Sequence, residues 1–336
     1  MRYDRRRLVT LLLFFSIAAT VQSSENHPLV YKRKYVMGTI FEIAAYDRSS
    51  ERASRAIESA FQEIVRIDDV LSNYKADSEL SRLNRSAHFH AEHVPADLYR
   101  VVEQAEYFSR ISDGKFDISI APLVNLWKAA LSGDAVPSPI QQLEVRRCVG
   151  YEKIELVPPD QIIFHSPCLQ LDLGAIGKGY AVDRAAEVLK SSGVRNALIN
   201  AGGSTILALG APPAHDAWLI HLRDPSNKVD PQVMLKDESL STSEQTPRSL
   251  LGKDSAGHIV DPDTGMPLKT EFAVSVIAKT ATMSDGLSTT LLLLGPDKGR
   301  ALIRDLPDVS AIWISPKAEV EKATYGPPVI FSGKAR

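Results

Sequence analysis

One short glycine-rich segment most constrains how this chain can fold. The residues from Asp172 to Tyr180 read D-L-G-A-I-G-K-G-Y, at a point where a strand must lead into a helix. Glycines at 174, 177 and 179 allow a close approach of the backbone, and the N-terminus of the following helix attracts anions. Lys178 adds a positive charge. The spacing matches neither a Walker A loop nor G-x-G-x-x-G, so the segment predicts a phosphate site or a plain strand-to-helix turn.

A second segment, S-D-G-L-S-T from Ser284 to Thr289, supplies candidate metal ligands. Asp285 and Thr289 lie four residues apart on a predicted helix, so their side chains point the same way. One carboxylate and one hydroxyl suit Mg²⁺, which takes phosphates and water as further ligands, and a main-chain carbonyl of the glycine loop would add another. Alternatively, Asp285 stabilises the helix dipole and Thr289 bonds within its own helix. Because the sequence pairs Asp285 with no partner, we expect Asp285→Ala to leave folding largely intact.

Three further side chains stand in unusual contexts. His258 precedes the turn D-P-D-T-G (Asp261–Gly265), and a histidine beside a diphosphate and a metal can act as the base for an attacking hydroxyl. Tyr74 and Phe116 lie in polar or glycine-containing turns, where a flat ring system can stack on them. The structural alternatives, a buried histidine and two core aromatics, stay open.

Hydrophobic periodicity predicts the fold class. It favours helices over residues 51–71, 97–111, 180–191, 282–294 and 298–306, and strands over residues 35–46, 154–157, 162–165, 169–173, 196–200, 205–209, 218–222, 272–278 and 309–315. Strands mostly adjoin strands and helices are clustered, which is typical of an α+β fold rather than a βαβ array. The net charge of −2 gives no support for nucleic-acid binding.

The N-terminal residues resemble a targeting segment. Arg2 and Arg5–Arg7 precede the apolar stretch Leu8–Val21, which is too short to span a membrane, and Val21-Gln22-Ser23 is an acceptable cleavage site. We therefore predict a signal peptide over 1–24, cleavage near residue 23, and a periplasmic domain over 25–336 with no transmembrane segment. Without a nearby cysteine a lipid anchor is excluded. The run R-R-L-V leaves the Sec and twin-arginine routes equally open.

The chain has two cysteines, Cys148 and Cys168. In an oxidising compartment two cysteines can form a disulfide. Each can instead be a small buried residue, and we favour this second interpretation.

The motifs occur together, in a fixed order. They are M-G-T (37–39), S-N-Y-K-A-D-S-E-L-S-R-L-N (72–84), S-D-G-K-F-D-I-S-I-A-P-L-V-N-L-W (112–127), D-L-G-A-I-G-K-G-Y-A-V-D (172–183), N-A-G-G (200–203), H-I-V-D-P-D-T-G (258–265) and S-D-G-L-S-T (284–289). As an ordered set, from about residue 35 to 315, they resemble the ApbE family of FAD:protein FMN transferases.

The resemblance implies a single ApbE-like (T-fold-like) α+β unit of two packed lobes with a cleft for FAD. It also implies a Mg²⁺-dependent enzyme that transfers FMN from FAD to a threonine hydroxyl of a target redox protein and releases AMP. Two alternatives remain: hydrolysis of FAD to FMN and AMP, with water in place of threonine, and a non-catalytic periplasmic flavin-binding protein.

The resemblance also implies roles for individual residues. His258 would lie near the reacting phosphate, and the Ala175 carbonyl, Asp285 and Thr289 would hold Mg²⁺. The flavin-nucleotide positions would be Met37, Tyr74, Lys115, Phe116, Asp117, Asp172, Lys178 and Ile259. The chain departs from the pattern at two positions. Some relatives have an acidic residue at the position of Ser288, and its replacement by serine would weaken metal binding. Some members also have an acidic residue at the position of Lys178.

Overall fold

The computed structural model describes residues 27–133, 135–245, 248–250, 253–256, 258–324 and 329–331, so the predicted signal peptide lies outside it. The helices are α1 (Ser50–Leu71), α2 (Glu79–Ser86), α3 (Ala96–Ile111), α4 (Ala121–Gly133), α5 (Pro139–Arg146), α6 (Gly177–Ser191) and α7 (Ala281–Ile303), with a 3-10 turn at Tyr151–Lys153. The strands are β1 (Leu29–Val36), β2 (Thr39–Tyr46), β3 (Glu92–His93), β4 (Ile154–Val157), β5 (Gln161–Phe164), β6 (Asn196–Ala201), β7 (Thr205–Leu209), β8 (Trp218–His221), β9 (Pro231–Leu235), β10 (Glu238–Glu244), β11 (Arg248–Leu250), β12 (Lys253–Ala256), β13 (Val260–Asp261), β14 (Met266–Pro267), β15 (Ala273–Ala278), β16 (Ser310–Ile314), β17 (Val320–Thr324) and β18 (Val329–Phe331).

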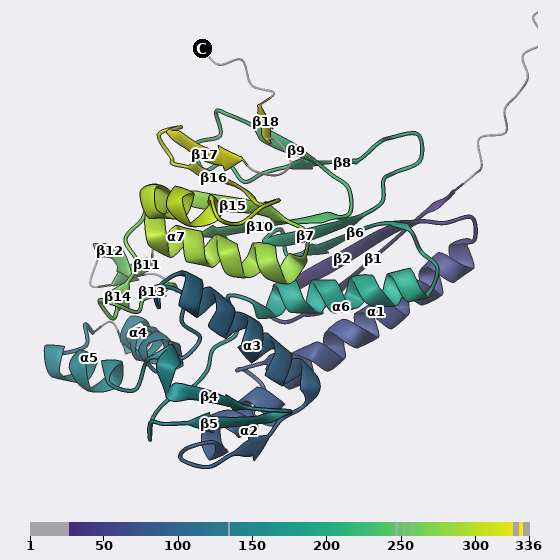
Figure 1. Ribbon diagram of the computed structural model, residues 1–336. Helices are drawn as coiled ribbons and strands as arrows, with labels where there is room; N and C mark the ends of the chain where they lie inside the picture. The colour runs from purple at the N-terminus through teal and green to yellow at the C-terminus, as the bar shows by residue number, and fades with distance from the viewer. Residues whose placement is uncertain are drawn as a thin grey trace, which may run out of the picture.

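An eight-stranded sheet forms the larger lobe. Its strand order is β1-β2-β6-β7-β10-β15-β16-β17, and every neighbouring pair is antiparallel. Helices α1, α6 and α7 lie together on one side of it (Figure 1). An antiparallel sheet with its helices segregated to one face is an α+β architecture, which confirms the predicted class.

The sheet-facing side of each helix is apolar because its hydrophobic residues recur at helical spacing. In α1 the residues Ala53, Ile57, Ala60, Phe61 and Ile64 are buried, and the Ser49 side chain caps the helix by accepting the Arg52 N–H. No helix in the described ranges is both long enough and apolar enough to cross a membrane.

The opposite face of the sheet is partly covered by a second, three-stranded sheet, β18-β9-β8. Ile220 and Val233 of this small sheet pack against Leu240, Ile277 and Ile312 of the large one. The central strands are therefore buried on both faces, and β15 reads as a continuous apolar run with one serine, A-V-S-V-I-A.

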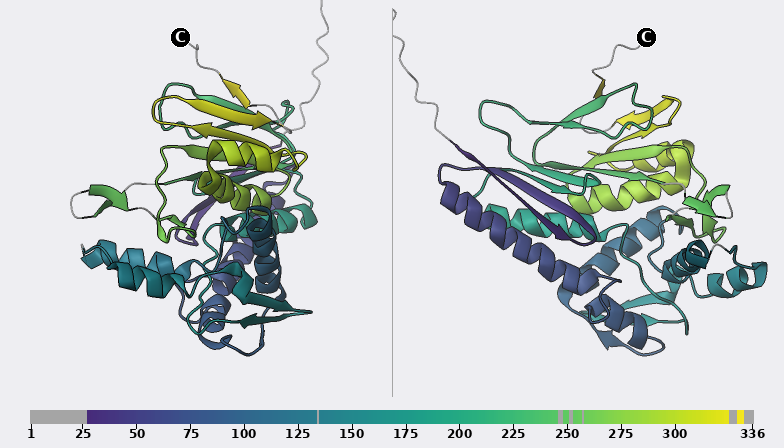
Figure 2. Two further views of the ribbon diagram at one scale, coloured as in Figure 1. Left: turned by 60° about the vertical axis from the view of Figure 1, so that its left-hand side comes forward. Right: turned by 180° about the vertical axis from the view of Figure 1, so that it is seen from behind.

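The smaller lobe contains α2 to α5 and the sheet β3-β5-β4. Its side chains Leu80, Leu98 and Phe164 belong to the same hydrophobic cluster as Phe41 and Val276 of the large sheet, so one core joins both lobes. In the left view of Figure 2, α4 and α5 project from the same side of the molecule as the hairpin of β11 and β12.

Two predicted elements differ from the structure. Residues 35–46 form no single strand, because Met37 and Gly38 adopt positive φ and turn the chain between β1 and β2. Residues 169–173 contribute one isolated bridge, Ile120 to Gln170, instead of a strand. The two helices predicted over 282–294 and 298–306 are confirmed, because α7 consists of two helical parts separated at Gly295, whose backbone is not helical; the second part ends at Ile303.

The cysteines also differ from our expectation. Cys148 and Cys168 form a disulfide, so the interpretation as two separate buried residues was wrong. Cys148 is buried, but Cys168 is exposed.

Helices α6 and α7 cross in close contact at Gly179. A Cβ atom at this position would lie 2.3 Å from the Ala281 carbonyl oxygen and 2.7 Å from Asp285 Cβ. A backbone carbonyl cannot rotate away, so only glycine allows the two helices to approach this closely.

Gly179→Ala is expected to lower the free energy of unfolding by at least about 2 kcal/mol, because the added methyl must push α6 away from α7. The matched control is Gly133→Ala, where an added Cβ would meet nothing within 4 Å. This control should leave stability unchanged or slightly higher, since alanine favours helix. Urea denaturation measures both, and equal midpoints for the two variants would contradict the packing argument.

Candidate active site

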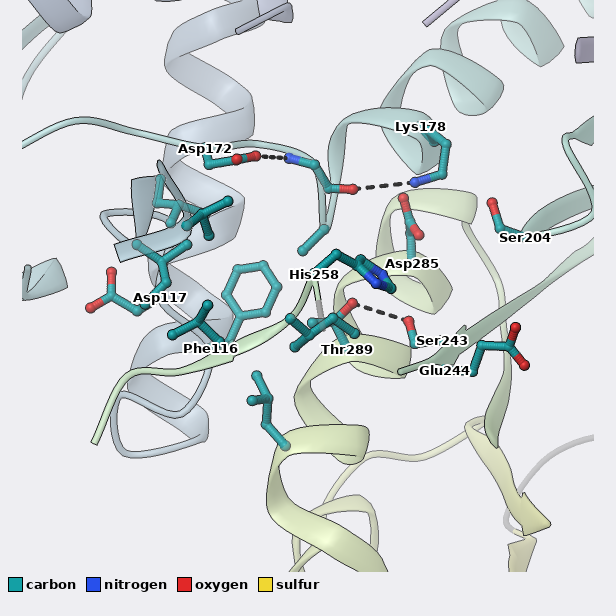
Figure 3. Close-up of a pocket in the computed structure, with 18 of the residues that line it drawn as sticks. Phe116, Asp117, Asp172, Lys178, Ser204, Ser243, Glu244, His258, Asp285 and Thr289 are labelled. Carbon is teal, nitrogen blue, oxygen red and sulfur yellow. Dashed lines mark hydrogen bonds between the residues drawn. The ribbon is translucent and has the colours of Figure 1, made fainter. Parts of the chain in front are cut away.

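A cavity of about 410 Å³, within the usual size of a ligand pocket, lies where the two lobes meet. It is lined by both lobes: by the loop after α3 and the start of α4 on one side, and by the N-terminus of α6, the β6–β7 turn, the end of β10 and α7 on the other. Figure 3 shows side chains from these segments around one space.

All the predicted site residues except Met37 line this cavity. They are Tyr74, Lys115, Phe116, Asp117, Asp172, Ala175, Lys178, His258, Ile259, Asp285 and Thr289. Met37 instead packs against the hydrophobic core, and its Cε lies 3.8 Å from where a Cβ of Gly177 would stand. Met37 therefore packs against the start of α6 on the core side and does not line the cavity.

Asp285 is a buried carboxylate at the inner end of the cavity. Its Oδ2 accepts the Gly179 N–H (2.8 Å) and its Oδ1 accepts the Thr205 hydroxyl (3.2 Å). Burial raises the pKa of Asp285, against the opposing charge of Lys178. The premise that Asp285 has no partner is therefore wrong, and Asp285→Ala would leave a buried N–H without its acceptor, at a cost of about 1–3 kcal/mol.

Thr289 is held from β10. Its hydroxyl lies 3.1 Å from the Ser243 hydroxyl, which is also 2.7 Å from that of Ser288. Figure 3 shows Ser243 and Thr289 joined in this way. The bond within its own helix proposed for Thr289 is made by Thr290 instead, which donates to the Gly286 carbonyl. Ser288 is buried and also donates to the Asp285 carbonyl, so it does not face the cavity as an acidic residue would.

The glycine segment lines the cavity, but its glycine N–H groups have other acceptors. Gly174 donates to Asp172 Oδ1 (2.8 Å), Gly177 to the Leu173 carbonyl (2.7 Å) and Gly179 to Asp285. The prediction that these N–H groups bind phosphate is therefore not supported. Lys178 remains as the positive group of the segment, and its Nζ donates to the Gly174 carbonyl (3.2 Å).

The D-P-D-T-G turn binds the smaller lobe. Lys115 Nζ lies 2.9 Å from Asp261 Oδ1 and 2.8 Å from Asp263 Oδ2. Burial works against the charge on Lys115, but the hydrogen bonds to Asp263 and Asp261 outweigh it and raise the pKa of Lys115. Trp127 Nε1 also donates to the Gly265 carbonyl (2.8 Å). The turn is thus fixed by the loop after α3 and by α4.

Two aromatic rings border the opposite end of the cavity. Phe116 is buried at 2% exposure, whereas Tyr74 is 85% exposed. Lys128 Nζ lies 5.1 Å from the centre of the Tyr74 ring and donates to its hydroxyl (3.2 Å). The sequence left open that Tyr74 and Phe116 are both core aromatics, and the structure places only Phe116 in the core. Tyr74 lines the cavity as an exposed ring with Lys128 over it.

His258 is exposed and lines the cavity together with Asp285 and Thr289. It directly precedes Ile259, whose N–H and carbonyl are held by the Gln245 side chain (3.1 and 2.8 Å). This anchor places the histidine at the edge of the cavity and excludes a core role for it.

The donor set fits Mg²⁺. A carboxylate, a hydroxyl and a main-chain carbonyl are hard oxygen ligands of the kind that this ion takes. The Asp285 carboxylate accepts two hydrogen bonds from protein and has capacity for further partners. Asp285, Thr289 and Ala175 face the same cavity, which leaves room for phosphate oxygens as the remaining ligands.

Several cavity residues were missed by sequence reasoning, namely Ser204, Ser243, Arg223, Glu244 and Lys128. Thr205, which holds Asp285, was also missed. A signal for part of this set is present, because serine recurs at 239, 241 and 243 in the run E-S-L-S-T-S-E. This alternation predicts a strand with one hydroxyl face. Arg223 and Glu244, which form an ion pair at 2.6 Å, carry no comparable signal.

Comparison with known proteins decides the family. The sequence model of the protein family described as "ApbE family" matches residues 37–313 of this chain. The chain belongs to the ApbE family. It is 31% identical over 310 residues to the FAD:protein FMN transferase of Treponema pallidum (strain Nichols), covering 86% of this chain and 85% of that one. It is 29% identical over 307 residues to that of Klebsiella pneumoniae (strain 342), covering 88% and 92%.

Solved ApbE structures share the fold. The flavin transferase ApbE from Vibrio cholerae superposes with a TM-score of 0.75 at 26% identity, covering 91% of this chain and 98% of that one. The apo flavinyl transferase ApbE of Pseudomonas stutzeri gives 0.76 at 28% identity, covering 89% and 96%. These relatives confirm the predicted family, the fold and the enzyme class, a transferase.

The Asp117 carboxyl provides a pH-dependent test of the site. Burial raises the pKa of Asp117 from 3.8 to about 6, despite hydrogen bonds from the Ser119 N–H (2.7 Å) and the Tyr151 N–H (3.1 Å). Between these two values the folded protein holds a proton that the unfolded chain has released, so stability falls as pH rises through this range.

Asparagine does not titrate, so the stability of Asp117→Asn relative to the parent protein should increase from about pH 4 to about pH 7 by roughly 1–3 kcal/mol. Thermal denaturation of the ligand-free proteins across this range measures the difference. A difference that stays constant with pH would contradict a half-buried Asp117 with a raised pKa.

Proposed function

We propose that this protein transfers FMN from FAD to a threonine hydroxyl of a target redox protein, with Mg²⁺, and releases AMP. The observation that carries the proposal is the buried Asp285 carboxylate at the junction of α6 and α7, in one cavity with Thr289, Lys178 and His258. The names of the relatives, which are FAD:protein FMN transferases, support the same reaction.

The two ends of the cavity suit the two parts of such a substrate. Phe116, Ile118, Ile120 and Val124 form an apolar wall, with the exposed Tyr74 ring beside it. Aromatic and apolar side chains of this kind bind flat ring systems. The opposite end carries Lys178 and Asp285, which suit a diphosphate and its cation.

In the proposed reaction the threonine oxygen attacks the phosphorus of the FMN half. A bond from this oxygen to phosphorus forms, the bond from the same phosphorus to the bridging oxygen breaks, and AMP leaves with that oxygen. The threonine proton passes to His258. When bound by Asp285, Thr289 and the Ala175 carbonyl, Mg²⁺ supplies charge neutralisation on the diphosphate. Lys178 adds a second positive charge in the same region.

The direct test measures AMP release from FAD and Mg²⁺, with and without exported proteins of the host, followed by in-gel flavin fluorescence after denaturation. FMN transfer predicts AMP release that depends on protein acceptors, and one or more fluorescent bands. AMP release at the same rate without acceptors indicates FAD hydrolysis. FAD binding without AMP indicates a flavin-binding protein.

Asp285→Asn is expected to reduce Mg²⁺-dependent AMP release at least about 100-fold, because it removes the charge that a hard cation requires. Asparagine keeps an acceptor for the Gly179 N–H, so the protein stays folded. Thr289→Val should cause a smaller loss, since it removes one neutral ligand. Binding of Mn²⁺ in place of Mg²⁺, followed by electron paramagnetic resonance, checks the site apart from turnover. Normal activity of Asp285→Asn at low millimolar Mg²⁺ would contradict the assignment.

His258→Ala is expected to lower kcat about 10²–10⁴-fold with little effect on FAD affinity, because a base acts mainly in the transition state. His165→Ala is the matched control, since His165 is also exposed but pairs with Glu155 of β4 in the smaller lobe and does not line the cavity. If His258→Ala stays folded and cannot bind FAD, then His258 is a binding residue and another group takes the proton.

We also propose that the chain is exported to the periplasm, with residues 1–24 removed. The basic residues before the apolar stretch at 8–21 support this. Replacing Arg5 and Arg6 by lysine keeps the charge, so unchanged export indicates the Sec route and lost export the twin-arginine route. Mass spectrometry of the exported protein gives its first residue, and an uncleaved chain in the membrane fraction would contradict the proposal.

A further inference from the structure

The loop of residues 115–120, between α3 and α4, forms much of one wall of the cavity. Lys115, Phe116, Asp117, Ile118 and Ile120 all line it. The position of this loop therefore decides the shape of the apolar end. Its backbone forms part of no helix and no multi-residue strand, so it depends on neighbouring segments for its conformation.

One neighbouring segment, residues 149–151, holds the loop by two hydrogen bonds. The Gly150 N–H donates to the Ser119 hydroxyl (2.7 Å), and the Tyr151 N–H donates to Asp117 Oδ2 (3.1 Å). Both donors are backbone groups, so their placement depends on where the backbone of 149–151 runs.

A second neighbouring segment, residues 170–172, holds the loop from another direction. The Asp172 N–H donates to the Ile118 carbonyl (2.7 Å), and Gln170 forms a parallel bridge with Ile120. The second segment continues into the glycine run and α6. It is anchored independently, because the Leu171 N–H donates to the Asn84 side chain (2.7 Å).

The disulfide joins these two segments. Cys148 directly precedes the first, and Cys168 lies just before the second. The first segment is anchored at Val149, which is buried in a cluster with Leu123, Trp127 and Val260. The covalent bond thus connects two segments that are each anchored elsewhere, with the cavity loop bound to both.

We propose that the Cys148–Cys168 disulfide positions the flavin end of the cavity, so that its reduction weakens FAD binding while leaving the chemical step intact. The inference rests on the proposed function, in which this end receives the flavin nucleotide. Asp285, Thr289 and Lys178 lie on other elements, and their hydrogen bonds involve neither cysteine segment, so we expect these bonds to persist when the disulfide opens. FAD affinity therefore changes and kcat at saturating FAD does not.

The bond is accessible to a reductant at one end. Cys168 is exposed, whereas Cys148 is 6% exposed. A dithiol attacks the Cys168 sulfur as thiolate, and the Cys148 sulfur leaves and takes up a proton. The second thiol of the reductant then resolves the mixed disulfide, so two electrons pass from the dithiol to the cysteines. The matching partner class is a dithiol–disulfide oxidoreductase.

The test compares three proteins: the oxidised parent, the parent reduced with dithiothreitol, and the double variant Cys148→Ser/Cys168→Ser. FAD affinity is measured by quenching of flavin fluorescence, and kcat at saturating FAD by AMP release. We expect the reduced parent and the variant to bind FAD about tenfold or more weakly, with kcat within about twofold of the oxidised parent. The reductant should not change the variant. Equal affinity in all three proteins would overturn the proposal.

Two measurements separate other outcomes. Thermal denaturation shows whether the reduced protein is folded at the assay temperature, and global unfolding there would overturn a positioning role. Amide hydrogen exchange at Gly150, Tyr151 and Asp172 measures, without FAD, how firmly these N–H groups hold the loop of residues 115–120. Equal exchange in both redox states would overturn the proposed role of the disulfide. If the oxidised protein binds no FAD, the proposed function fails. Faster amide exchange on reduction would then still support the role of the disulfide in positioning the loop of residues 115–120.

Discussion

The hydrogen bond from the Gly179 N–H to the Asp285 carboxylate is the interaction on which the rest of the site depends. It joins the first turn of α6 to the first turns of α7, and the absence of a Cβ at Gly179 permits the contact. Thr205 of β7 binds the other oxygen of the same carboxylate. Two helices and a strand thus meet at one buried charge, and the inner end of the cavity is formed at that point.

The hydroxyl groups around Asp285 explain how a buried carboxylate is tolerated there. Ser241 donates to Thr205, Ser284 lies within hydrogen-bonding distance of Ser239 and Ser241, and Ser243 is bonded to Ser288 and Thr289. These groups satisfy polar atoms between β10 and α7 without adding positive charge. The positive charge of Lys178 acts on Asp285 and opposes the rise in its pKa that burial causes. The charge of Asp285 is therefore available to a bound metal ion.

Ion pairs join the loop after α3 to the segment that carries His258, on the other side of the cavity. Lys115 binds Asp261 and Asp263 at the start of the segment after His258, and Trp127 binds Gly265. The histidine, the apolar wall and the metal ligands come from three separate parts of the chain. Because both lobes share one hydrophobic core, these parts are held in a fixed relation.

The sequence by itself determined the family, the α+β class and eleven of the residues that line the cavity, because each motif carries a local property such as a turn, a helix face or a reactive side chain. Local patterns did not show that Met37 packs behind α6, nor that the glycine N–H groups bind Asp172, Leu173 and Asp285 in place of a phosphate. Tertiary structure alone decided the cysteine pairing and the partners of Asp285, Lys115 and Thr289. Each of these depends on contacts between residues far apart in the chain, and hydrophobic periodicity contains no information about such distances.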